Sequence, residues 1–590
     1  MYNVIFKVEG GEDVKVFAVG GENVLELART AGVPIDAPCS GNGKCGKCLV
    51  STIKGNVERQ CLACQTEVSC DTIVVVPKSV ANYINDISIV IFPRQGAGQG
   101  DGSSVLTQGG TDEPSPCPDE PSPCPAFGLA IDIGTTTVSA LLVDMTTGDI
   151  LAKATTGNAQ IRYGADVINR IIEQQKPGGI KRLQDAIVQD TLLPLINNLC
   201  DAKGVNRENI TRLTVAANTT MNHLLLGIDA NSIRIEPYEP AFLEFEIMNP
   251  AVIGINLSPE AEMLIAPNVG SYVGGDITAG ILGTGAPTGW QMWPMSGEMP
   301  PGEQIIIDGV TYETEEVPNK LSLFIDLGTN GEIVLSNREY MLTCACSAGP
   351  AFEGGDISCG MRAADGAIEK CTIDKDTMTP EITVIGGGKP AGLCGSGLID
   401  VVAELFRAGI INSKGKLIHI TEDGSMSYDR ILHDEYGISC YVLAFADDSS
   451  TGKEIALTEA DIDNFIRAKA AIFSGIISLL SPLDMSPADI DDVFIAGGIG
   501  SGINIKNAVT IGMLPDLPTE KYKYLGNTAL DGAYSMLLLM YGEQALEEVA
   551  EIARNMTYID LSTQPGYMDE FIAACFLPHT DEKLFPAIIN

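Results

Sequence analysis

The most constraining feature of the sequence is a short motif, Asp-x-Gly-Thr, that occurs twice at domain-scale spacing. It is found first as Asp132-Ile133-Gly134-Thr135 and later as Asp326-Leu327-Gly328-Thr329, and each copy stands between two apolar, strand-like runs. A strand–turn–strand with glycine and threonine at its tip can wrap a phosphate with backbone N–H groups and hydroxyls, while the aspartate is placed for a hydrated magnesium ion. The repetition predicts an α/β region built from two copies of one unit.

A third glycine-rich turn, Ile495-Ala496-Gly497-Gly498-Ile499-Gly500, follows another apolar strand-like run. Tight glycines let the backbone approach a sugar and an α-phosphate. Each motif alone is a weak signal, whose simpler interpretation is an ordinary turn, but three in this order predict a nucleotide site. The run does not complete the Gly-x-Gly-x-x-Gly fingerprint, which disfavours a dinucleotide-binding fold. The predicted site has Asp132 and Asp326 as catalytic carboxylates, Gly134, Thr135, Thr136, Gly328, Thr329 and Asn330 around the phosphates, and Gly497 and Gly498 at the nucleoside.

The composition changes sharply along the 590 residues. Residues 95–125 are dominated by Gly, Ser, Gln, Pro and Asp, and the sequence Asp-Glu-Pro-Ser-Pro-Cys-Pro occurs there twice in tandem. Such a segment cannot bury a core, so it is expected to be a flexible tether. The predicted organisation is a small α+β domain over 1–80, a linker over 81–126 that contains the tether, a first nucleotide-binding subdomain over 127–210, and a C-terminal nucleotide-binding region over 211–590.

The small domain is expected to hold a metal centre. Two strand-like runs, Tyr2–Val8 and Asp13–Val19, precede a helix over Val24–Thr30 that Asn23 can cap, and further strands are expected at Cys48–Ile53 and Thr72–Val76. Between them lies a glycine-rich loop with the pattern Cys-x5-Cys-x2-Cys. Its first gap is one residue longer than in plant-type ferredoxins. The ligands predicted for a [2Fe–2S] cluster are Cys39, Cys45, Cys48 and Cys64.

A zinc site is the alternative interpretation of the same cysteines. Cys45-x2-Cys48 and Cys61-x2-Cys64 are two pairs with spacing close to that of a zinc ribbon. That alternative gives Cys39 and its glycine-rich surroundings no role, and it matches the predicted strand–strand–helix prelude less well. The iron–sulfur interpretation is therefore favoured, with Cys61 and Cys70 as spare cysteines.

The charge balance limits the possible partners. The chain has 77 acidic residues and 37 Lys+Arg, a formal net charge of −40 at pH 7. Phosphate backbones and anionic lipids would repel such a surface, so nucleic-acid and membrane roles are disfavoured. The sequence starts without a signal peptide pattern, and its longest apolar stretch, Ala470–Leu480, is too short to span a bilayer. A cytoplasmic location is expected, where clustered cysteines serve metal or redox chemistry rather than disulfides.

Taken together, the three nucleotide motifs resemble the superfamily of acetate and sugar kinases, Hsp70 and actin. The added cysteine module narrows the resemblance to the ATP-dependent reductive activators of corrinoid proteins. That resemblance implies an α/β multidomain chain: a β-grasp, ferredoxin-like domain, a flexible linker and a two-lobed ATPase. It also implies a [2Fe–2S] cluster, ATP and Mg²⁺ as cofactors, and a corrinoid protein and a low-potential electron donor as partners. The implied reaction is the reduction of the corrinoid cobalt from Co(II) to Co(I). The resemblance leaves open whether the protein is a homodimer. Further family-like stretches are Asn218–Gly227, Tyr272–Gly280, Ser347–Gly355 and Cys394–Leu398.

Three rival functions share parts of this pattern. A small-molecule kinase explains the phosphate loops but not the cysteine module, an activator of 2-hydroxyacyl-CoA dehydratases needs subunit-bridging cysteines, and a redox-sensing module binds ATP without turnover.

Other residues are weaker candidates for the site. His223 is expected to be a packing or capping histidine, and Asp276 is expected to be either a turn residue or a contact to nucleotide or magnesium. Buried packing is the expected role of the remaining clustered cysteines, Cys344, Cys346, Cys359, Cys371 and Cys394.

Overall fold

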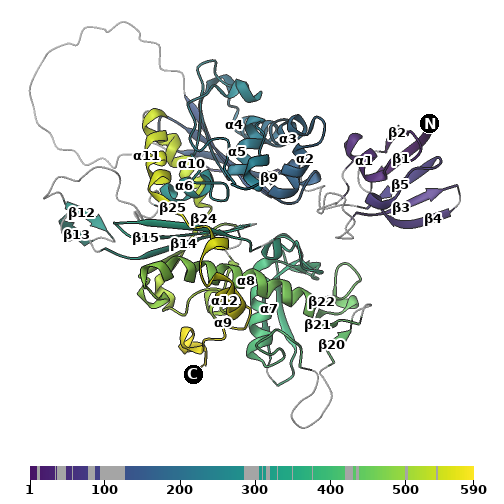
Figure 1. Ribbon diagram of the computed structural model, residues 1–590. Helices are drawn as coiled ribbons and strands as arrows, with labels where there is room; N and C mark the ends of the chain where they lie inside the picture. The colour runs from purple at the N-terminus through teal and green to yellow at the C-terminus, as the bar shows by residue number, and fades with distance from the viewer. Residues whose placement is uncertain are drawn as a thin grey trace, which may run out of the picture. The chain divides into compact units, whose positions relative to one another are not determined.

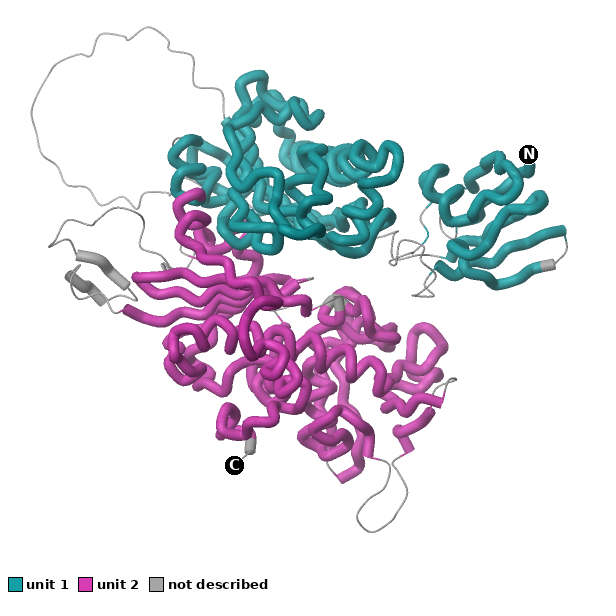
Figure 2. Tube along the Cα trace, in the orientation of Figure 1, with its two compact units in different colours: residues 1–279, 532–549 teal, residues 280–531, 550–590 magenta. Residues whose placement is uncertain are grey.

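The structure is a computed structural model. It describes residues 1–8, 13–33, 35, 48–55, 57–77, 87–92, 126–284, 304–307, 310–313, 319–328, 330–348, 350–374, 376–418, 429–433, 437–498, 502–539 and 542–589. The predicted tether and the predicted site residues Cys39, Cys45 and Thr329 lie outside these ranges. Two compact units divide the chain (Figure 2): unit 1 is 1–279 with 532–549, and unit 2 is 280–531 with 550–590.

In its described residues, the N-terminal domain consists of a five-stranded sheet and one α-helix (Figure 1). The strand order is β2-β1-β5-β3-β4, with β1 antiparallel to β2 and parallel to β5. Alternation of buried and exposed residues along the strands places Val4, Phe6, Val74 and Val76 in one core. Its elements are β1 (Tyr2–Val8), β2 (Val14–Ala18), α1 (Val24–Thr30), β3 (Leu49–Lys54), β4 (Val57–Leu62) and β5 (Thr72–Val76). This is the predicted ferredoxin-like α+β fold.

Unit 1 continues with a six-stranded sheet in the order β11-β10-β7-β8-β9-β6. The strands β7, β8 and β9 form an antiparallel meander, while β10 and β11 run parallel to β7. The elements are β6 (Ser88–Ile91), β7 (Phe127–Ile133), β8 (Thr137–Asp144), β9 (Ile150–Gly157), α2 (Val167–Gln174), α3 (Gly179–Ile187), α4 (Leu193–Lys203), β10 (Ile210–Ala217), α5 (Thr219–Leu226), β11 (Glu262–Ile265) and α6 (Gly275–Gly283).

Unit 2 repeats this sheet. Its order is β24-β23-β14-β15-β16-β25, in which β14, β15 and β16 form the meander and β23 and β24 run parallel to β14. The sheet is formed by β14 (Ser322–Leu327), β15 (Gly331–Ser336), β16 (Met341–Cys346), β23 (Asp492–Ala496), β24 (Tyr522–Gly526) and β25 (Met556–Tyr558). Asp132 and Gly134 in unit 1, and Asp326 and Gly328 in unit 2, therefore lie where the first strand of each meander turns into the second, as the sequence predicts.

The other elements of unit 2 are three smaller sheets and a set of helices. The strands are β12 (Gln304–Ile307), β13 (Val310–Glu313), β17 (Ala367–Ile373), β18 (Pro380–Val384), β19 (Gly392–Leu393), β20 (Ile431–His433), β21 (Ser439–Ala444) and β22 (Ile455–Thr458). The helices are α7 (Gly395–Arg407), α8 (Glu459–Leu480), α9 (Ile505–Thr510), α10 (Thr528–Leu538), α11 (Gly542–Asn555), α12 (Tyr567–Ala574) and α13 (Pro586–Ile589). The unit boundary falls within α6, α10 and α11.

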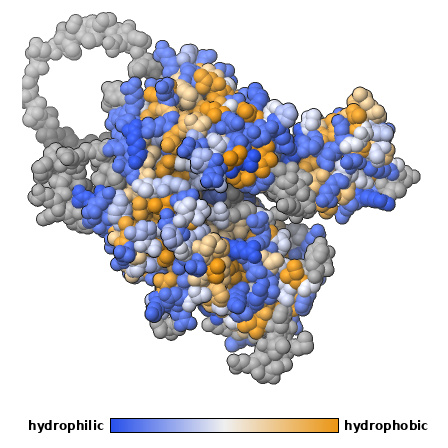
Figure 3. All heavy atoms as spheres, in the orientation of Figure 1, coloured by the Kyte–Doolittle hydropathy of each residue, from blue (hydrophilic) through white to orange (hydrophobic). Residues whose placement is uncertain are grey.

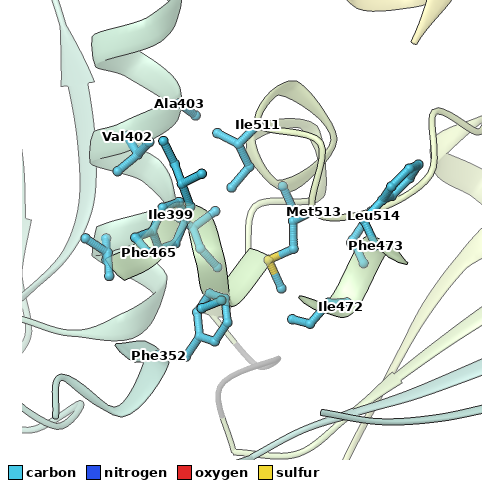
Figure 4. Packing of buried hydrophobic residues seen from close by; sticks show 14 of the residues in the cluster. Phe352, Ile399, Val402, Ala403, Phe465, Ile472, Phe473, Ile511, Met513 and Leu514 are labelled. Carbon is cyan, nitrogen blue, oxygen red and sulfur yellow. The ribbon is translucent and has the colours of Figure 1, made fainter. Parts of the chain in front are cut away.

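The core of unit 2 is centred on α7 and α8. Phe352, Ile399, Phe465 and Met513 come from four different segments and converge in the interior (Figure 4). A capping box starts α8, because Asp461 N–H donates to Thr458 Oγ1 at 3.1 Å and Thr458 N–H donates to Asp461 Oδ2 at 2.9 Å. This helix is long and apolar enough to cross a membrane, but 72% of its apolar window is buried inside the fold. We therefore assign α8 as a core helix.

Two predicted boundaries fall on elements of the first ATPase sheet. The strand β6 lies inside the range predicted as linker and pairs with β9, so this part of the linker contributes an edge strand. The boundary predicted after residue 210 falls at the start of β10, which pairs with β7 in the centre of the sheet.

On the visible face in Figure 3, hydrophilic side chains surround separate hydrophobic patches.

Candidate functional site

In the N-terminal domain, two of the four predicted cluster ligands lie side by side. The sulfur atoms of Cys48 and Cys64 are 3.2 Å apart. The backbone creates this proximity, because Ala63 N–H donates to Cys48 O at 2.8 Å and Asn23 Nδ2 donates to Cys64 O at 2.7 Å. Two thiolates that converge in this way can chelate one iron of a [2Fe–2S] cluster, so the described part of the site fits that group.

The spare cysteine Cys61 has a different neighbour. It lies on β4, where its sulfur is 3.5 Å from Thr52 Oγ1. Within the described ranges, no three His, Cys, Asp or Glu side chains are grouped as metal ligands, so Cys61 does not complete a set with Cys48 and Cys64. The geometry supports the iron–sulfur interpretation over the zinc ribbon, which requires Cys61 beside Cys64.

The first phosphate loop is the turn between β7 and β8. Gly134 N–H donates to Thr137 O at 2.9 Å, which closes the turn. A Cβ on Gly134 would lie 2.6 Å from that same oxygen, so the turn requires glycine there. Asp132 is half-buried at the end of β7, and Thr137 is exposed at the tip. Of the two threonines predicted to contact phosphate, Thr135 is buried and Thr136 is half-buried in this turn.

Interior donors hold the carbonyl groups of this loop. Asn158 Nδ2 donates to Gly134 O at 2.9 Å, and Asn158 N–H donates to Thr136 O at 2.9 Å. The buried Arg170 donates through Nη2 to Thr135 O, and Asn218 Nδ2 donates to Thr135 Oγ1 at 3.0 Å. Sequence reasoning missed Asn158 and Arg170. A polar residue just after β9 and an arginine inside an apolar helix are weak signals on their own.

The candidate Asp276 belongs to a turn that packs against the start of α5. It is half-buried at the start of α6, and its Oδ1 accepts a hydrogen bond from Ile277 N–H at 3.0 Å. The preceding Gly274 touches the beginning of α5, because a Cβ there would lie 2.4 Å from Thr219 N and 2.5 Å from Asn218 Cα. The Gly-Gly-Asp turn therefore packs against the segment that holds Thr135 Oγ1.

In unit 2, the second phosphate loop and the third glycine turn are neighbours on adjacent strands. Asp326 of β14 pairs with Ala496 of β23 and with Glu332 of β15. Gly497 directly follows Ala496, and a Cβ on it would lie 2.6 Å from Asp326 Oδ1. Gly328 N–H donates to Asn330 O at 3.1 Å within the loop. The structure thus brings Asp326, Gly328, Asn330 and Gly497 together at one edge of the sheet.

Space remains at two of these glycines. Among the atoms of the described residues, a Cβ on Gly328 would have Asn330 O as its nearest neighbour, 3.9 Å away, and a Cβ on Gly498 would meet none within 4 Å. Packing of the described residues therefore does not demand glycine at either position. Open space above both turns is what a phosphate and a nucleoside require, so the residues fit ATP. That Asp132 and Asp326 face each other across a cleft stays a prediction.

Two unpredicted residues support this edge of unit 2. Tyr524 Oη donates to Gly497 O at 2.9 Å, while Gly497 N–H donates to Gly526 O at 2.9 Å, so β24 holds the glycine turn from both ends. Glu332 is buried directly opposite Asp326 on β15. Glu332 is part of the second motif in the sequence. Its pairing with Asp326 could not be predicted, because it depends on the length of the turn between β14 and β15.

The remaining candidates have packing roles. His223 is buried: its Nδ1–H donates to Thr219 O at 2.7 Å, its Nε2 accepts from Ala241 N–H at 3.1 Å, and burial lowers its pKa. Burial likewise raises the pKa of the Cys344 and Cys346 thiols well above the ordinary value, and that of Cys359 and Cys371 to about 12. Neutral, buried thiols act as small hydrophobic side chains, as the sequence predicts for them.

Comparison with known proteins agrees with this arrangement. Residues 7–69 match the family model of the 2Fe-2S iron-sulfur cluster binding domain, residues 127–287 that of the RACo middle region, and residues 320–589 that of the C-terminal, ASKHA domain of RACo. A solved structure described as a reductive activator for corrinoid,iron-sulfur protein is 36% identical, covers 100% of both chains and has a TM-score of 0.66.

Two curated relatives point the same way. The corrinoid activation enzyme RamQ of Eubacterium limosum is 28% identical over 93% of this chain and 95% of its own length. The [Co(II) methylated amine-specific corrinoid protein] reductase of Methanosarcina barkeri is 22% identical over 73% of each chain. With a full-length relative at 36% identity and all three regions matched, this chain belongs to the family of ATP-dependent reductive activators of corrinoid proteins.

Proposed function

We propose that this protein returns the Co(II) corrinoid of a partner protein to Co(I), with an electron that passes through its own ferredoxin-like domain and with coupling to ATP. The observation that carries the proposal is the convergence of the Cys48 and Cys64 sulfurs, 3.2 Å apart, in a chain that also contains the duplicated phosphate-loop fold. A kinase of the same fold has no use for such a thiol pair.

The proposed cluster ligands are Cys39, Cys45, Cys48 and Cys64. When bound, a [2Fe–2S] cluster supplies single electrons at a potential near roughly −400 mV. The chain contributes the fixed spacing of its sulfurs: β3 and the turn after β4 are joined by the hydrogen bond from Ala63 N–H to Cys48 O. This bond holds Cys48 and Cys64 together and leaves Cys61 at Thr52.

The proposed nucleotide contacts lie on the phosphate loop of each unit. In unit 1, Thr135 and Thr136 contact phosphates and Asp132 holds a hydrated Mg²⁺; in unit 2, Asp326 does the same beside Gly328. Gly497 and Gly498 face the nucleoside, and the backbone of Gly497 is held by Tyr524 and Gly526. The further proposed phosphate contacts are Gly134, Thr329 and Asn330.

We propose that nucleotide binding is coupled to electron transfer because the nucleotide and the corrinoid protein both bind one arrangement of the chain more tightly than another. Reduction of Co(II) is uphill from an ordinary ferredoxin potential, so another source of free energy is required. A nucleotide that stabilises one arrangement of the chain over another can raise the affinity of that arrangement for the corrinoid partner. The acidic surface of the chain, with its net charge of −40, suits a basic patch on that partner.

The experiment uses anaerobic, iron-loaded protein mixed with a Co(II) corrinoid protein and a low-potential chemical reductant. Visible absorbance then follows the conversion of Co(II) to Co(I) with ATP, with ADP and without nucleotide. We expect conversion of Co(II) to Co(I) in the sample with ATP, and none in the samples with ADP or without nucleotide. A Gly328→Val variant is expected to keep the cluster, which belongs to a different domain, and to fail to support conversion.

Two outcomes would contradict the proposal. Stoichiometric zinc without iron in the purified protein would remove the electron carrier. ATP consumption driven by a sugar or another small hydroxyl compound, with no change at cobalt, would favour the kinase function.

A further inference from the structure

The guanidinium group of Arg170 is fully buried directly beneath the first phosphate loop. Its Nη2 donates to Thr135 O, its Nε donates to Gly164 O at 3.0 Å, and its Nη1 donates to Gln160 Oε1 at 3.0 Å and to Met221 Sδ at 3.2 Å. Arginine stays protonated in proteins, so a positive charge is placed inside unit 1 at this point. Burial of a charge is costly unless hydrogen bonds compensate for it, so this placement calls for a function.

The hydrogen bonds to the loop determine which way its peptide groups point. In a trans peptide the C=O and the following N–H point in opposite directions. Asn158 holds Gly134 O and Arg170 holds Thr135 O toward the interior. The N–H groups of Thr135 and Thr136 therefore point the other way, toward the tip of the loop. Successive N–H groups with this orientation form an anion-binding concavity.

We propose that Arg170 is a positioning residue for the phosphates of the bound nucleotide, a role that rests on the proposed ATP site. It fixes the Thr135 carbonyl through a charge-assisted hydrogen bond, which is stronger than a neutral one. The same bond aims the Thr136 N–H at the phosphate and places a cation behind the loop. Arg170 does not touch the nucleotide; it acts through the Thr135–Thr136 peptide.

The shape of the side chain explains why arginine is needed. The planar guanidinium of Arg170 reaches Gly164 O from one nitrogen, Thr135 O from a second and Gln160 Oε1 from a third. A lysine has one nitrogen and cannot hold all three partners in fixed directions. Lysine at this position should therefore keep the charge but lose the orientation of the loop.

The test compares ligands with increasing numbers of phosphates: adenosine, AMP, ADP and ATP. Their affinities are measured on the full-length, iron-loaded wild type, Arg170→Lys and Arg170→Gln. We expect unchanged adenosine affinity, about tenfold or greater weakening for ADP and ATP in Arg170→Gln, and a smaller loss in Arg170→Lys. Equal weakening for adenosine and ATP, or no weakening for ATP, would overturn the proposal.

A matched control is available in the same unit. Arg212 is also mostly buried, but it binds Glu262 Oε2 at 3.1 Å and Leu539 O at 2.5 Å, near the start of β10 rather than at the loop. Arg212→Gln should lower the unfolding temperature and leave all four affinities unchanged. If it shifts them as Arg170→Gln does, the effect reports general loss of stability and the proposal fails.

Hydrogen exchange on the wild type tests the same link if the Arg170 variants do not fold. ADP should slow exchange in α2, which carries Arg170, as well as at the loop; unchanged exchange in α2 would overturn the proposal. Failure of the inference and failure of the proposed function are distinguishable. If Arg170→Gln weakens ATP binding but the wild type does not convert Co(II) to Co(I), only the proposed corrinoid function fails. If Arg170→Gln binds ATP with the wild-type affinity and still supports ATP-driven conversion, only the inference about Arg170 fails.

Discussion

Gly497 lies against the carboxylate of Asp326: a Cβ on Gly497 would be 2.6 Å from Asp326 Oδ1 and 2.4 Å from Leu327 O. The two residues come from parallel neighbouring strands, β23 and β14, whose ends reach the same edge of the sheet. The glycine also has φ +90°, a conformation that other residues rarely adopt. The second phosphate loop and the glycine turn are therefore in direct contact.

The first prediction concerns this contact. Gly497→Ala should cost about 1–3 kcal/mol of unfolding free energy, because the new Cβ overlaps Asp326 and Leu327 and the backbone is strained. Gly498→Ala is the matched control, since its Cβ would meet nothing within 4 Å, and it should leave the unfolding temperature unchanged. Thermal unfolding of both variants without nucleotide checks this. Equal stability of the two variants would contradict it.

The second prediction concerns Gly328, where the fold has room. The nearest atom to a Cβ there is Asn330 O at 3.9 Å, so Gly328→Val should fold with about the wild-type unfolding temperature. Its side chain would occupy the space proposed for phosphate, and ADP binding should be lost. Calorimetric titration with ADP measures this. Wild-type affinity in Gly328→Val would show that phosphate does not approach this turn.

The third prediction separates two nearby cysteines. Cys64→Ser should reduce the iron content and the charge-transfer absorbance, because the Cys64 sulfur lies 3.2 Å from that of Cys48. Cys61→Ser should retain both, since the Cys61 sulfur lies beside Thr52 Oγ1. Iron analysis of anaerobically purified protein gives the answer. Loss of iron in Cys61→Ser with retention in Cys64→Ser would reverse the assignment.

Local signals in the sequence were sufficient for much of the fold. Asn23 caps α1, which begins and ends as predicted, and the two Asp-x-Gly-Thr motifs lie at equivalent turns of equivalent sheets. These features depend on residues that are close in sequence: a cap and its helix, or a turn and its two strands. Short-range physics therefore predicts them without knowledge of the tertiary contacts.

Features that depend on long-range contacts were not predicted. Arg170 lies 35 residues from Thr135, whose carbonyl it holds, and Tyr524 lies 27 residues from Gly497. The strand β6 pairs with β9, which is distant in the sequence, and no local sequence pattern predicts that pairing. For Tyr524 and β6 the partner is set by the order of strands in the sheet. For Arg170 it is set by the packing of helix α2 beneath the first phosphate loop. Cys48 and Cys64 are an intermediate case: both were predicted as ligands of one cluster, but the pairing of β3 with β4 is what brings their sulfurs together.

The fourth prediction concerns pH. Burial lowers the pKa of His223, so the native state favours the neutral ring, whose Nε2 accepts from Ala241 N–H. Its stabilising contribution is therefore present above the ordinary histidine pKa of about 6.5 and is lost as the pH falls through the lower native value. The urea midpoint should fall more between pH 7.5 and 5.5 in the wild type than in His223→Gln. Equal decreases would exclude His223 as the source.

The last prediction concerns coupling between nucleotide and electron transfer. Asp326 is half-buried at the site edge of the unit 2 sheet, so its removal should cost little packing. Asp326→Ala should keep the fold and the iron, yet fail to convert a Co(II) corrinoid partner even with excess chemical reductant. Asp492→Asn is the matched control: Asp492 lies on β23 at the opposite end of the sheet and pairs with Lys523 at 2.9 Å, and its variant should stay active. Absorbance at the cobalt bands and phosphate release are followed in the same sample. Conversion at the wild-type rate by Asp326→Ala, with phosphate release abolished, would separate ATP turnover from electron transfer. The duplicated fold would then require another role, and phosphoryl transfer to a small molecule would become the better explanation of its two phosphate loops.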